Sequence, residues 1–252
     1  MKLRLNQSTE APPRVRPAFY ALTSGGWRDY VTLLHPPYTL WHLSYVIWGA
    51  ALAGGSHYDR LAATLVAFFL AMGVAGHALD ELQGRPLRTQ IDSRVLWVFA
   101  GLGLAGAVSL GALGSALVSP WLLAFVVFGL FIAPAYNLEW FRGRFHSDAW
   151  FAFSWGSFPL LTAYFASAER LSVAAVLGAV MAFALSLAQR SLSGRVRALR
   201  RRARSIEGRV LYNDGTVDDI DQRWATETDE RALLLISGSV FAGSVAMLVA
   251  YL

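Results

Sequence analysis

The residues from His77 to Arg94 (HALDELQGRPLRTQIDSR) combine an imidazole, carboxylates and guanidiniums directly after a long apolar segment. His77, Asp80, Glu81 and Gly84 follow one another at spacings of i, i+3, i+4 and i+7, so on a helix they share one face. Carboxylates are the ligands that Mg²⁺ prefers, and arginine side chains bind phosphate oxygens. The sequence therefore predicts a site that holds a divalent cation and a phosphorylated ligand together.

The same residues also allow a purely structural interpretation. Asp80 and Glu81 lie near the end of a predicted helix, where the helix dipole disfavours negative charge. Ion pairs with Arg85 and Arg88, across a turn at 84–86, would relieve that cost without any ligand. A ligand site and a salt-bridged helix end are therefore both open alternatives.

The composition places these residues in a helical membrane protein. Of the 252 residues, 55% are hydrophobic and 15% are charged, whereas a soluble domain carries about 25% charged residues. Several apolar segments approach the roughly 20 residues that cross a bilayer. The chain has no cysteine, which excludes disulfides and thiolate metal sites. We therefore expect an all-α, multi-pass helical bundle in the inner or plasma membrane.

The apolar segments predict about seven transmembrane helices. Residues 1–36 form a polar lead-in without the apolar core of a signal peptide, and residues 37–252 form a single transmembrane domain with a charged loop at 190–231. The predicted spans cover residues 38–54, 61–79, 95–113, 118–136, 149–167, 171–189 and 232–252. The third and fourth spans are expected to form a tight helical hairpin, because few residues separate them.

The basic residues gather in alternate loops. The lead-in and the loops after the second, fourth and sixth spans carry 20 of the 22 lysine and arginine residues, whereas the opposite side has only Arg60 and Arg170. Because basic residues are enriched on the cytoplasmic side of a membrane, this distribution predicts a cytoplasmic N-terminus and an external C-terminus.

The loop after the sixth span has a basic half and an acidic half. A basic helix over 189–204 is suited to anionic lipid or to a phosphorylated ligand, and equally to a topology anchor neutralised by the acidic residues that follow. Residues 210–217 (VLYNDGTV) are typical of a β-hairpin, and their spacing does not fit a calcium loop. Nucleic-acid binding is not expected, because the arginines lie between two spans and precede acidic residues.

Several segments resemble the UbiA superfamily of intramembrane prenyltransferases. His35-Pro36 followed by WGAALA at 48–53 is similar to the opening pattern of that family. YNLEWFRG at 136–143 is similar to the family's loop between its fourth and fifth helices, and FSWGSFPL at 153–160 resembles its glycine- and proline-containing signature. The resemblance covers residues 30–190 and implies a helical bundle with a cytoplasmic-facing cavity.

The resemblance also implies two aspartate-rich motifs that bind an allylic pyrophosphate through magnesium. The first motif, NxxxDxxxD, falls on His77, Glu81 and Arg85, with Asp80 alongside, so only one position keeps a carboxylate. The second, DxxxD, falls on 189–193 (QRSLS), where no carboxylate remains. The family usually has nine spans. The chain therefore departs from the family at the residues that would bind the metal ions.

The resemblance and the side-chain chemistry together predict a prenyl-pyrophosphate site. Asp80 and Glu81 are the candidate catalytic residues and the candidate ligands of a magnesium ion. The candidate substrate-binding residues are polar or basic: His77, Arg85, Arg88, Asn137, Arg142, Gln189 and Arg190. Aromatic side chains at 140–155 are suited to stabilising a nearby carbocation.

We expect one of two functions. The first is that of a UbiA-like integral membrane prenyltransferase, which binds a polyprenyl pyrophosphate with magnesium at a cytoplasmic-facing cavity. The alternative is a non-catalytic UbiA-like protein that binds an isoprenoid, quinone or pigment within a membrane complex. The expected partners are membrane lipid, an isoprenoid pyrophosphate or other prenyl-tailed ligand, and further membrane proteins.

Overall fold

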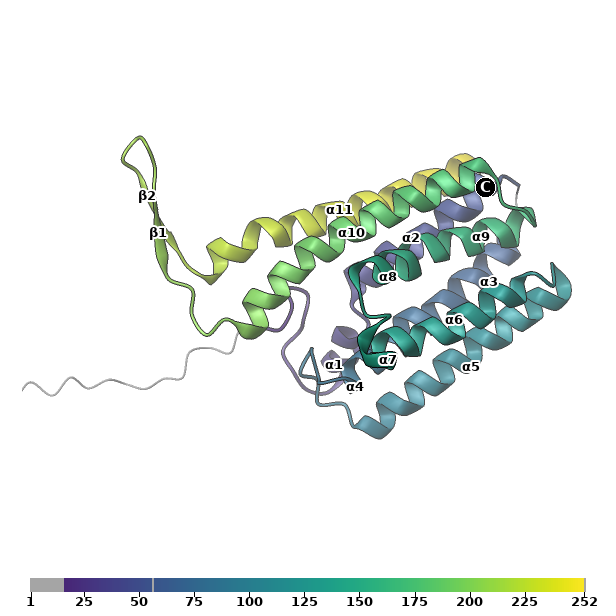
Figure 1. Ribbon diagram of the computed structural model, residues 1–252, viewed down its shortest axis with the longest axis horizontal. Coiled ribbons are helices and arrows are strands. Elements are labelled where there is room, and N and C mark those ends of the chain that lie inside the picture. The colour runs from purple at the N-terminus through teal and green to yellow at the C-terminus, as the bar shows by residue number, and fades with distance from the viewer. Residues whose placement is uncertain (1–15, 56, 252) are drawn as a thin grey trace, which may run out of the picture.

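The computed structural model describes residues 16–55 and 57–251, so residues 1–15 of the predicted lead-in lie outside the described part of the chain. Helices form the body of the molecule, and a two-stranded hairpin projects from one end (Figure 1). The helices are α1 (Trp27–Leu33), α2 (Pro36–Ala53), α3 (Tyr58–Phe68), α4 (His77–Leu82), α5 (Ser93–Leu117), α6 (Leu122–Asn137), α7 (Trp140–Gly143), α8 (Asp148–Ala152), α9 (Phe158–Ala168), α10 (Val173–Arg202) and α11 (Gln222–Tyr251). Two π-helical segments, η1 (Phe69–Gly76) and η2 (Phe153–Ser157), join α3 to α4 and α8 to α9.

Helices occupy the predicted apolar ranges, and 4 helices in the described part of the chain are long and apolar enough to cross a membrane. They are the continuous helix Tyr58–Leu82, α5, α10 and α11. Large apolar side chains on these helices face outward, with Leu102 68%, Leu177 65% and Val249 82% exposed. Such extensive exposed apolar surface marks a membrane-facing protein. The chain is therefore an all-helical membrane bundle with a small β-hairpin attached.

The connections between the helices lie at two opposite ends of the bundle. The C-terminus and the connections α2–α3, α5–α6 and α9–α10 lie at one end, and α1, α4, α7 and the hairpin lie at the other (Figure 1). We call the second end the basic end, because the arginines of α7, of the loop after α4 and of the last turns of α10 lie there. At the opposite end Arg60 forms an ion pair with Glu169 at 3.0 Å.

Helix α2 lies inside the bundle and packs against α9 and α11. Trp41 and Tyr45 are fully buried, and the indole Nε1 of Trp41 donates a hydrogen bond to the Tyr45 hydroxyl at 2.5 Å. Gly49 allows α9 to approach closely, because a Cβ at this position would lie 2.1 Å from the carbonyl oxygen of Leu160. Small residues at such crossings are typical of membrane helices, where backbone proximity supplies the packing energy.

The hairpin consists of β1 (Gly208–Leu211) and β2 (Val217–Ile220), paired antiparallel. Its turn places Gly215 at φ +84°, a conformation that favours glycine, and the backbone N–H of Tyr212 donates to the Thr216 carbonyl at 2.9 Å. The β-hairpin expected from VLYNDGTV is thus confirmed. Because both strands are mostly exposed, the hairpin adds little to the core of the bundle.

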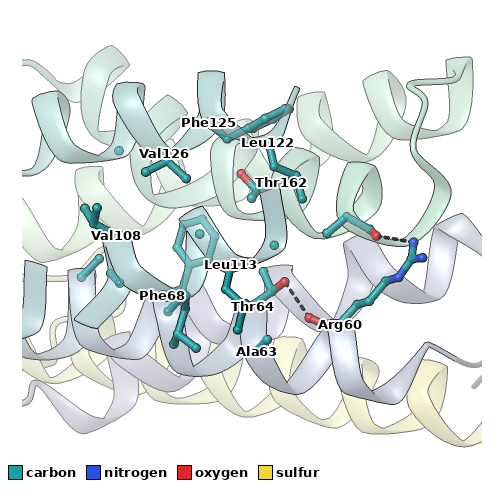
Figure 2. Close-up of a pocket in the computed structure, with 18 of the residues that line it drawn as sticks. Arg60, Ala63, Thr64, Phe68, Val108, Leu113, Leu122, Phe125, Val126 and Thr162 are labelled. Carbon is teal, nitrogen blue, oxygen red and sulfur yellow. Dashed lines mark hydrogen bonds between the residues drawn. The ribbon is translucent and has the colours of Figure 1, made fainter. Parts of the chain in front are cut away.

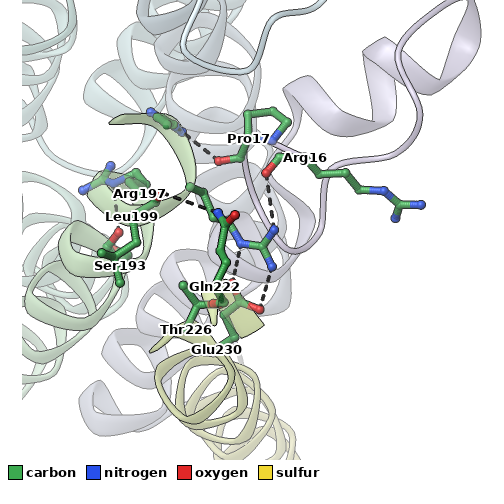
Figure 3. Close-up of polar contacts among 10 residues, drawn as sticks. Arg16, Pro17, Ser193, Arg197, Leu199, Gln222, Thr226 and Glu230 are labelled. Atoms are coloured by element: carbon green, nitrogen blue, oxygen red, sulfur yellow. Dashed lines mark hydrogen bonds and ion pairs between the residues drawn. The ribbon is translucent and has the colours of Figure 1, made fainter. Parts of the chain in front are cut away.

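Helices α10 and α11 run antiparallel to each other and extend past the other helices at the basic end (Figure 1). Arg200 holds them together through two hydrogen bonds to the Glu230 carboxylate, at 2.5 and 2.9 Å (Figure 3). Two arginines of α10 also hold the start of the described chain. Arg200 donates to the carbonyl of Arg16 at 3.4 Å, and Arg201 donates to that of Pro17 at 3.3 Å (Figure 3).

We expect the substitution Gly49→Ala to lower the melting temperature of the purified protein in detergent. The added methyl group would overlap the Leu160 carbonyl and force α2 away from α9, and overpacking of this kind costs about 1–3 kcal/mol. Gly101 of α5 provides a matched control, because a Cβ there meets no atom within 4 Å. Gly101→Ala should leave the melting temperature unchanged or raise it. Equal melting temperatures for wild type and Gly49→Ala would contradict the close contact.

Candidate functional site

A cavity of about 550 Å³ lies at the basic end of the bundle. Residues of α2, α4, α8 and α10 form its wall, together with the segment 18–20 near the start of the described chain. Four arginines, two carboxylates and four histidines line it, alongside the aromatic rings of Phe151 and Trp155. A polar cavity of this kind, inside an otherwise apolar bundle, is the main candidate for a functional site.

The structure brings five of the nine predicted site residues to this cavity: His77, Asp80, Asn137, Gln189 and Arg190. They come from α4, from the end of α6 and from α10, which are far apart in the sequence. The other four predicted residues do not line it: Glu81, Arg85, Arg88 and Arg142. The π-helical segment η1 leads directly into His77, and η2 contains Trp155. Such π-helical turns are frequent at functional sites.

Glu81, predicted as a catalytic residue and magnesium ligand, instead holds the loop that follows α4. Its side chain is fully buried (0% exposed). The carboxylate accepts hydrogen bonds from the backbone N–H of Leu87 and from both the N–H and the hydroxyl of Thr89, each at 2.9 Å. The two oxygens are therefore occupied by donors of the loop and turned away from the cavity.

The ion pairs considered for this helix end do not form either. Arg85 donates instead to the carbonyl of Ile91 and to the hydroxyl of Ser93, both at 2.6 Å, so its guanidinium fastens the loop to the start of α5. The backbone carbonyl of Arg88 accepts a hydrogen bond from the Ser24 hydroxyl at 3.4 Å. Arg85 is therefore part of the loop structure, and the side chain of Arg88 is exposed and does not line the cavity.

Arg142, the fourth residue outside the cavity, lies exposed on α7. It sits in a short helical turn in which φ is positive, at +60°. Its guanidinium therefore faces outward at the basic end, and the expected contact with the ligand is not supported by its position.

Asp80 points in a different direction from its neighbour Glu81. It lines the cavity together with Arg190, Arg197 and Arg201. In the part of the chain that the structure describes, its carboxylate takes part in none of the hydrogen bonds or ion pairs. Asp80 is thus the predicted carboxylate that remains available to a ligand.

Arg197 and Arg201 of α10 are the main cavity residues that sequence reasoning missed. Gln189, Ser193, Arg197 and Arg201 recur every fourth residue, so they lie along one face of the helix and line the cavity. Beyond Gln189 and Arg190, the segment 189–204 was predicted only to be a basic helix, because arginines occur on all sides of it. The four-residue spacing was the signal that could have identified this face.

Each of three cavity arginines is held through its Nε atom. Arg190 pairs with Asp148 at 2.8 Å, Arg197 donates to the Ser193 carbonyl at 3.2 Å, and Arg201 donates to the Pro17 carbonyl at 3.3 Å. Within the described chain, the two terminal amino groups of each of these guanidiniums have no hydrogen-bond partner. The three side chains are therefore oriented by the protein, with their terminal N–H donors still available.

Four buried polar atoms of the cavity residues also lack a hydrogen-bond partner among the described residues. They are His35 Nε2, His42 Nδ1, the Tyr136 hydroxyl and Gln189 Oε1. Leaving such a group unpaired costs about 1–3 kcal/mol, so native proteins usually pair them with water or with a ligand. Four unpaired atoms around one cavity indicate that the cavity receives polar groups.

His35, which lies directly before α2, adds little positive charge to the wall of the cavity. His35 stacks on His77, with ring centroids 4.0 Å apart. Burial is the main cause that lowers the pKa of His35 well below its ordinary value, and the nearby His77 lowers it further. This imidazole is therefore neutral at pH 7. Burial raises the pKa of Tyr20, so its phenol stays protonated and can donate a hydrogen bond. Arg190, Arg197, Arg201 and Arg202 therefore supply positive charge to the cavity, whereas His35 does not.

The side chains of the cavity do not fit a magnesium ion. Mg²⁺ requires oxygen ligands and is usually bound through one or two carboxylates. The carboxylates that line the cavity are Asp80 and Glu139, and the described residues contain no group of three His, Asp or Glu side chains that could hold a metal. Where the second aspartate motif was expected, the wall presents Gln189 and Ser193.

A second hollow, of about 400 Å³, lies between α3, α5, α6 and α9 (Figure 2). Its wall is mostly apolar, with Phe68 and Phe125 among the lining residues. The hydroxyls of Thr64 and Thr162 donate to backbone carbonyls of their own helices at 2.7 Å, so they offer no free donor. Arg60, which also lines the hollow, is paired with Glu169. The mostly apolar wall suits the hydrocarbon chain of a lipid.

No family model, no curated protein and no solved structure matches this chain. The resemblance to the UbiA superfamily therefore rests on the sequence segments themselves.

We expect Glu81→Gln to destabilise the ligand-free protein and Asp80→Asn to leave it nearly as stable as wild type. In the first variant an amide NH₂ would face a backbone N–H donor of the loop, which should lower the free energy of unfolding by about 1–3 kcal/mol. In the second, no hydrogen bond of the described chain is lost. Melting temperatures in detergent without ligand measure both effects. A stable Glu81→Gln variant would contradict the structural role of Glu81.

Proposed function

We propose that this protein is a UbiA-like integral membrane protein that binds the phosphorylated head group of an isoprenoid lipid in the cavity at its basic end. The observation that carries the proposal is the set of three oriented arginines, Arg190, Arg197 and Arg201, whose terminal amino groups are left unpaired in the described chain. Arginine binds phosphate oxygens by paired, charge-assisted hydrogen bonds.

The charge of the cavity supports an anionic ligand. Four arginines and two carboxylates line it, and Asp148 outside the wall pairs with one of these arginines, so an excess of one positive charge remains. Charge inside a membrane bundle is costly unless it is paired or hydrated. A pyrophosphate group would balance the excess and would also provide acceptors for the phenols and neutral donors of the wall.

The position of the cavity supports an apolar tail on the same ligand. Phe151 and Trp155 stack with their rings 5.9 Å apart in the wall, and the surrounding helices expose apolar surface to lipid. An isoprenoid phosphate combines an anionic head with a tail that the bilayer can accommodate. In this proposal the chain crosses the inner or plasma membrane seven times, with its N-terminus and the basic end on the cytoplasmic side, as the positive-inside rule predicts.

Prenyl transfer is the second candidate function, favoured by the unpaired Asp80 and the aromatic rings around it. Breaking the C–O bond of an allylic pyrophosphate leaves the electron pair on the departing pyrophosphate, which the arginines would stabilise. The rings of Tyr136, Phe151 and Trp155 would stabilise the allylic cation. The nucleophilic atom of the acceptor would form the new bond to the allylic carbon, and the carboxylate of Asp80 would accept the proton that the acceptor loses. The alternative without transfer is a binding subunit for an isoprenoid, quinone or pigment.

Binding to purified protein in nanodiscs tests the head-group proposal. We expect geranylgeranyl pyrophosphate to bind at least tenfold more tightly than geranylgeraniol, which has the same tail without the phosphates. Arg197→Gln should weaken pyrophosphate binding by about tenfold or more, since a charge-assisted hydrogen bond contributes about 1.5–3 kcal/mol. Arg142 is an exposed arginine at the same end, so the control variant Arg142→Gln should bind the pyrophosphate as tightly as wild type. Equal affinities for alcohol and pyrophosphate would refute the proposal.

Release of inorganic pyrophosphate distinguishes transfer from binding alone. If the protein is a transferase, incubation with geranylgeranyl pyrophosphate and a lipid extract as the source of acceptor should release pyrophosphate. Asp80→Asn should then abolish that release while still binding the ligand. Tight binding without release in wild type would leave the binding function and exclude transfer to the acceptors in that extract.

A further inference from the structure

We infer that the cavity binds its phosphorylated ligand without a divalent cation, because the arginines of α10 supply the positive charge that a metal ion would otherwise provide. The inference rests on the proposed function and specifies how the head group is recognised. Three observations support it: the state of the carboxylates, the arrangement of α10, and the charge balance of the wall.

The carboxylates near the cavity are not arranged to hold a cation. Glu81 is occupied by three hydrogen bonds from its loop, and Asp148 is paired with Arg190 at 2.8 Å. Glu139 lines the cavity but is exposed to solvent, in a turn with φ +53°. Asp80 is therefore the one interior carboxylate of the described wall, and a single carboxylate is a weak site for Mg²⁺.

The face of α10 that lines the cavity presents an amide, a hydroxyl and cations. Gln189 and Ser193 are buried, at 2% and 5% exposure, and Gln189 Oε1 has no hydrogen-bond partner in the described chain. Arg197 and Arg201 continue the same face. Because the backbone or a carboxylate holds each arginine through Nε, the terminal amino groups are fixed before a ligand arrives. Such preorganisation favours binding of an anion.

A divalent cation would make the charge imbalance worse. The wall already carries four arginines against two carboxylates, and Asp148 compensates only one of these arginines. Like charges repel strongly where water is scarce. An anionic ligand relieves this repulsion, whereas a metal ion would add to it. The cavity is thus suited to an anion that arrives without a metal.

Titration of wild-type protein in nanodiscs with geranylgeranyl pyrophosphate tests the inference. We expect the dissociation constant to change less than threefold between a buffer with EDTA and one with millimolar magnesium. Loss of binding in EDTA, with recovery in magnesium, would overturn the inference and leave the proposed function standing. Absence of binding in both buffers would instead overturn the proposed function.

A gain of metal dependence provides a second test. The double substitution Gln189→Asp, Ser193→Asp places two carboxylates one helical turn apart in the cavity. This variant should bind at least tenfold more weakly in EDTA than in magnesium. Ser191→Asp, exposed on the same helix, should remain indifferent to magnesium. The melting temperature of the double variant establishes that it is folded. If the folded variant binds equally well in both buffers, the head group does not lie at this face of α10, and the inference is overturned.

Discussion

The buried carboxylate of Glu81 is the interaction on which the basic end of the molecule depends. The loop between α4 and α5 lies against the bundle, and its backbone N–H groups need acceptors where water is scarce. Glu81 supplies acceptors to Leu87 and Thr89, and the buried Asp29 supplies one to Gln90 at 2.8 Å. Two acidic side chains, one from α4 and one from α1, thus hold a single loop in place.

This arrangement also determines which carboxylate faces the cavity. Successive residues of a helix point about 100° apart, so Asp80 is directed elsewhere once Glu81 is directed into the loop. Asp80 then lies in the same wall as the arginines of α10. The loop and the cavity are therefore coupled through two adjacent residues, although only one of them is positioned to meet a ligand.

The long helix α10 joins the membrane-spanning part of the molecule to the cavity. Its first half is apolar and exposed to lipid, and its last turns carry the arginines. The Arg200–Glu230 pair anchors these turns to α11. Arg200 and Arg201 also bind the backbone carbonyls of Arg16 and Pro17, which holds that segment against α10. The arginines that face the cavity are thus held on a rigid element. Rigid placement matters because a phosphate is bound tightly only when its donors do not have to be ordered first.

The sequence by itself determined the class of the protein and much of its local structure. Apolar segments of membrane length required helices, because backbone groups in a bilayer must be paired within the chain. The turn residues of 213–215 determined the hairpin, and Ser147 caps α8 by accepting a hydrogen bond from the Trp150 N–H at 3.2 Å. These features depend on residues close together in the sequence. His77, Asp80, Gln189 and Arg190 were also identified as site residues, and the structure places them in one cavity.

Only the tertiary structure decided which neighbouring side chains face that cavity. Asp80 and Glu81 are both carboxylates at a helix end, and their roles diverge because a loop folds over one of them. Arg85 and Arg197 are both arginines of the basic end, but both terminal amino groups of Arg85 are bonded within its loop and the start of α5, whereas Arg197 lines the cavity. Periodicity predicts which residues share a helix face, but not what that face packs against. That partner comes from distant parts of the chain, so the composition of the site was decided by packing.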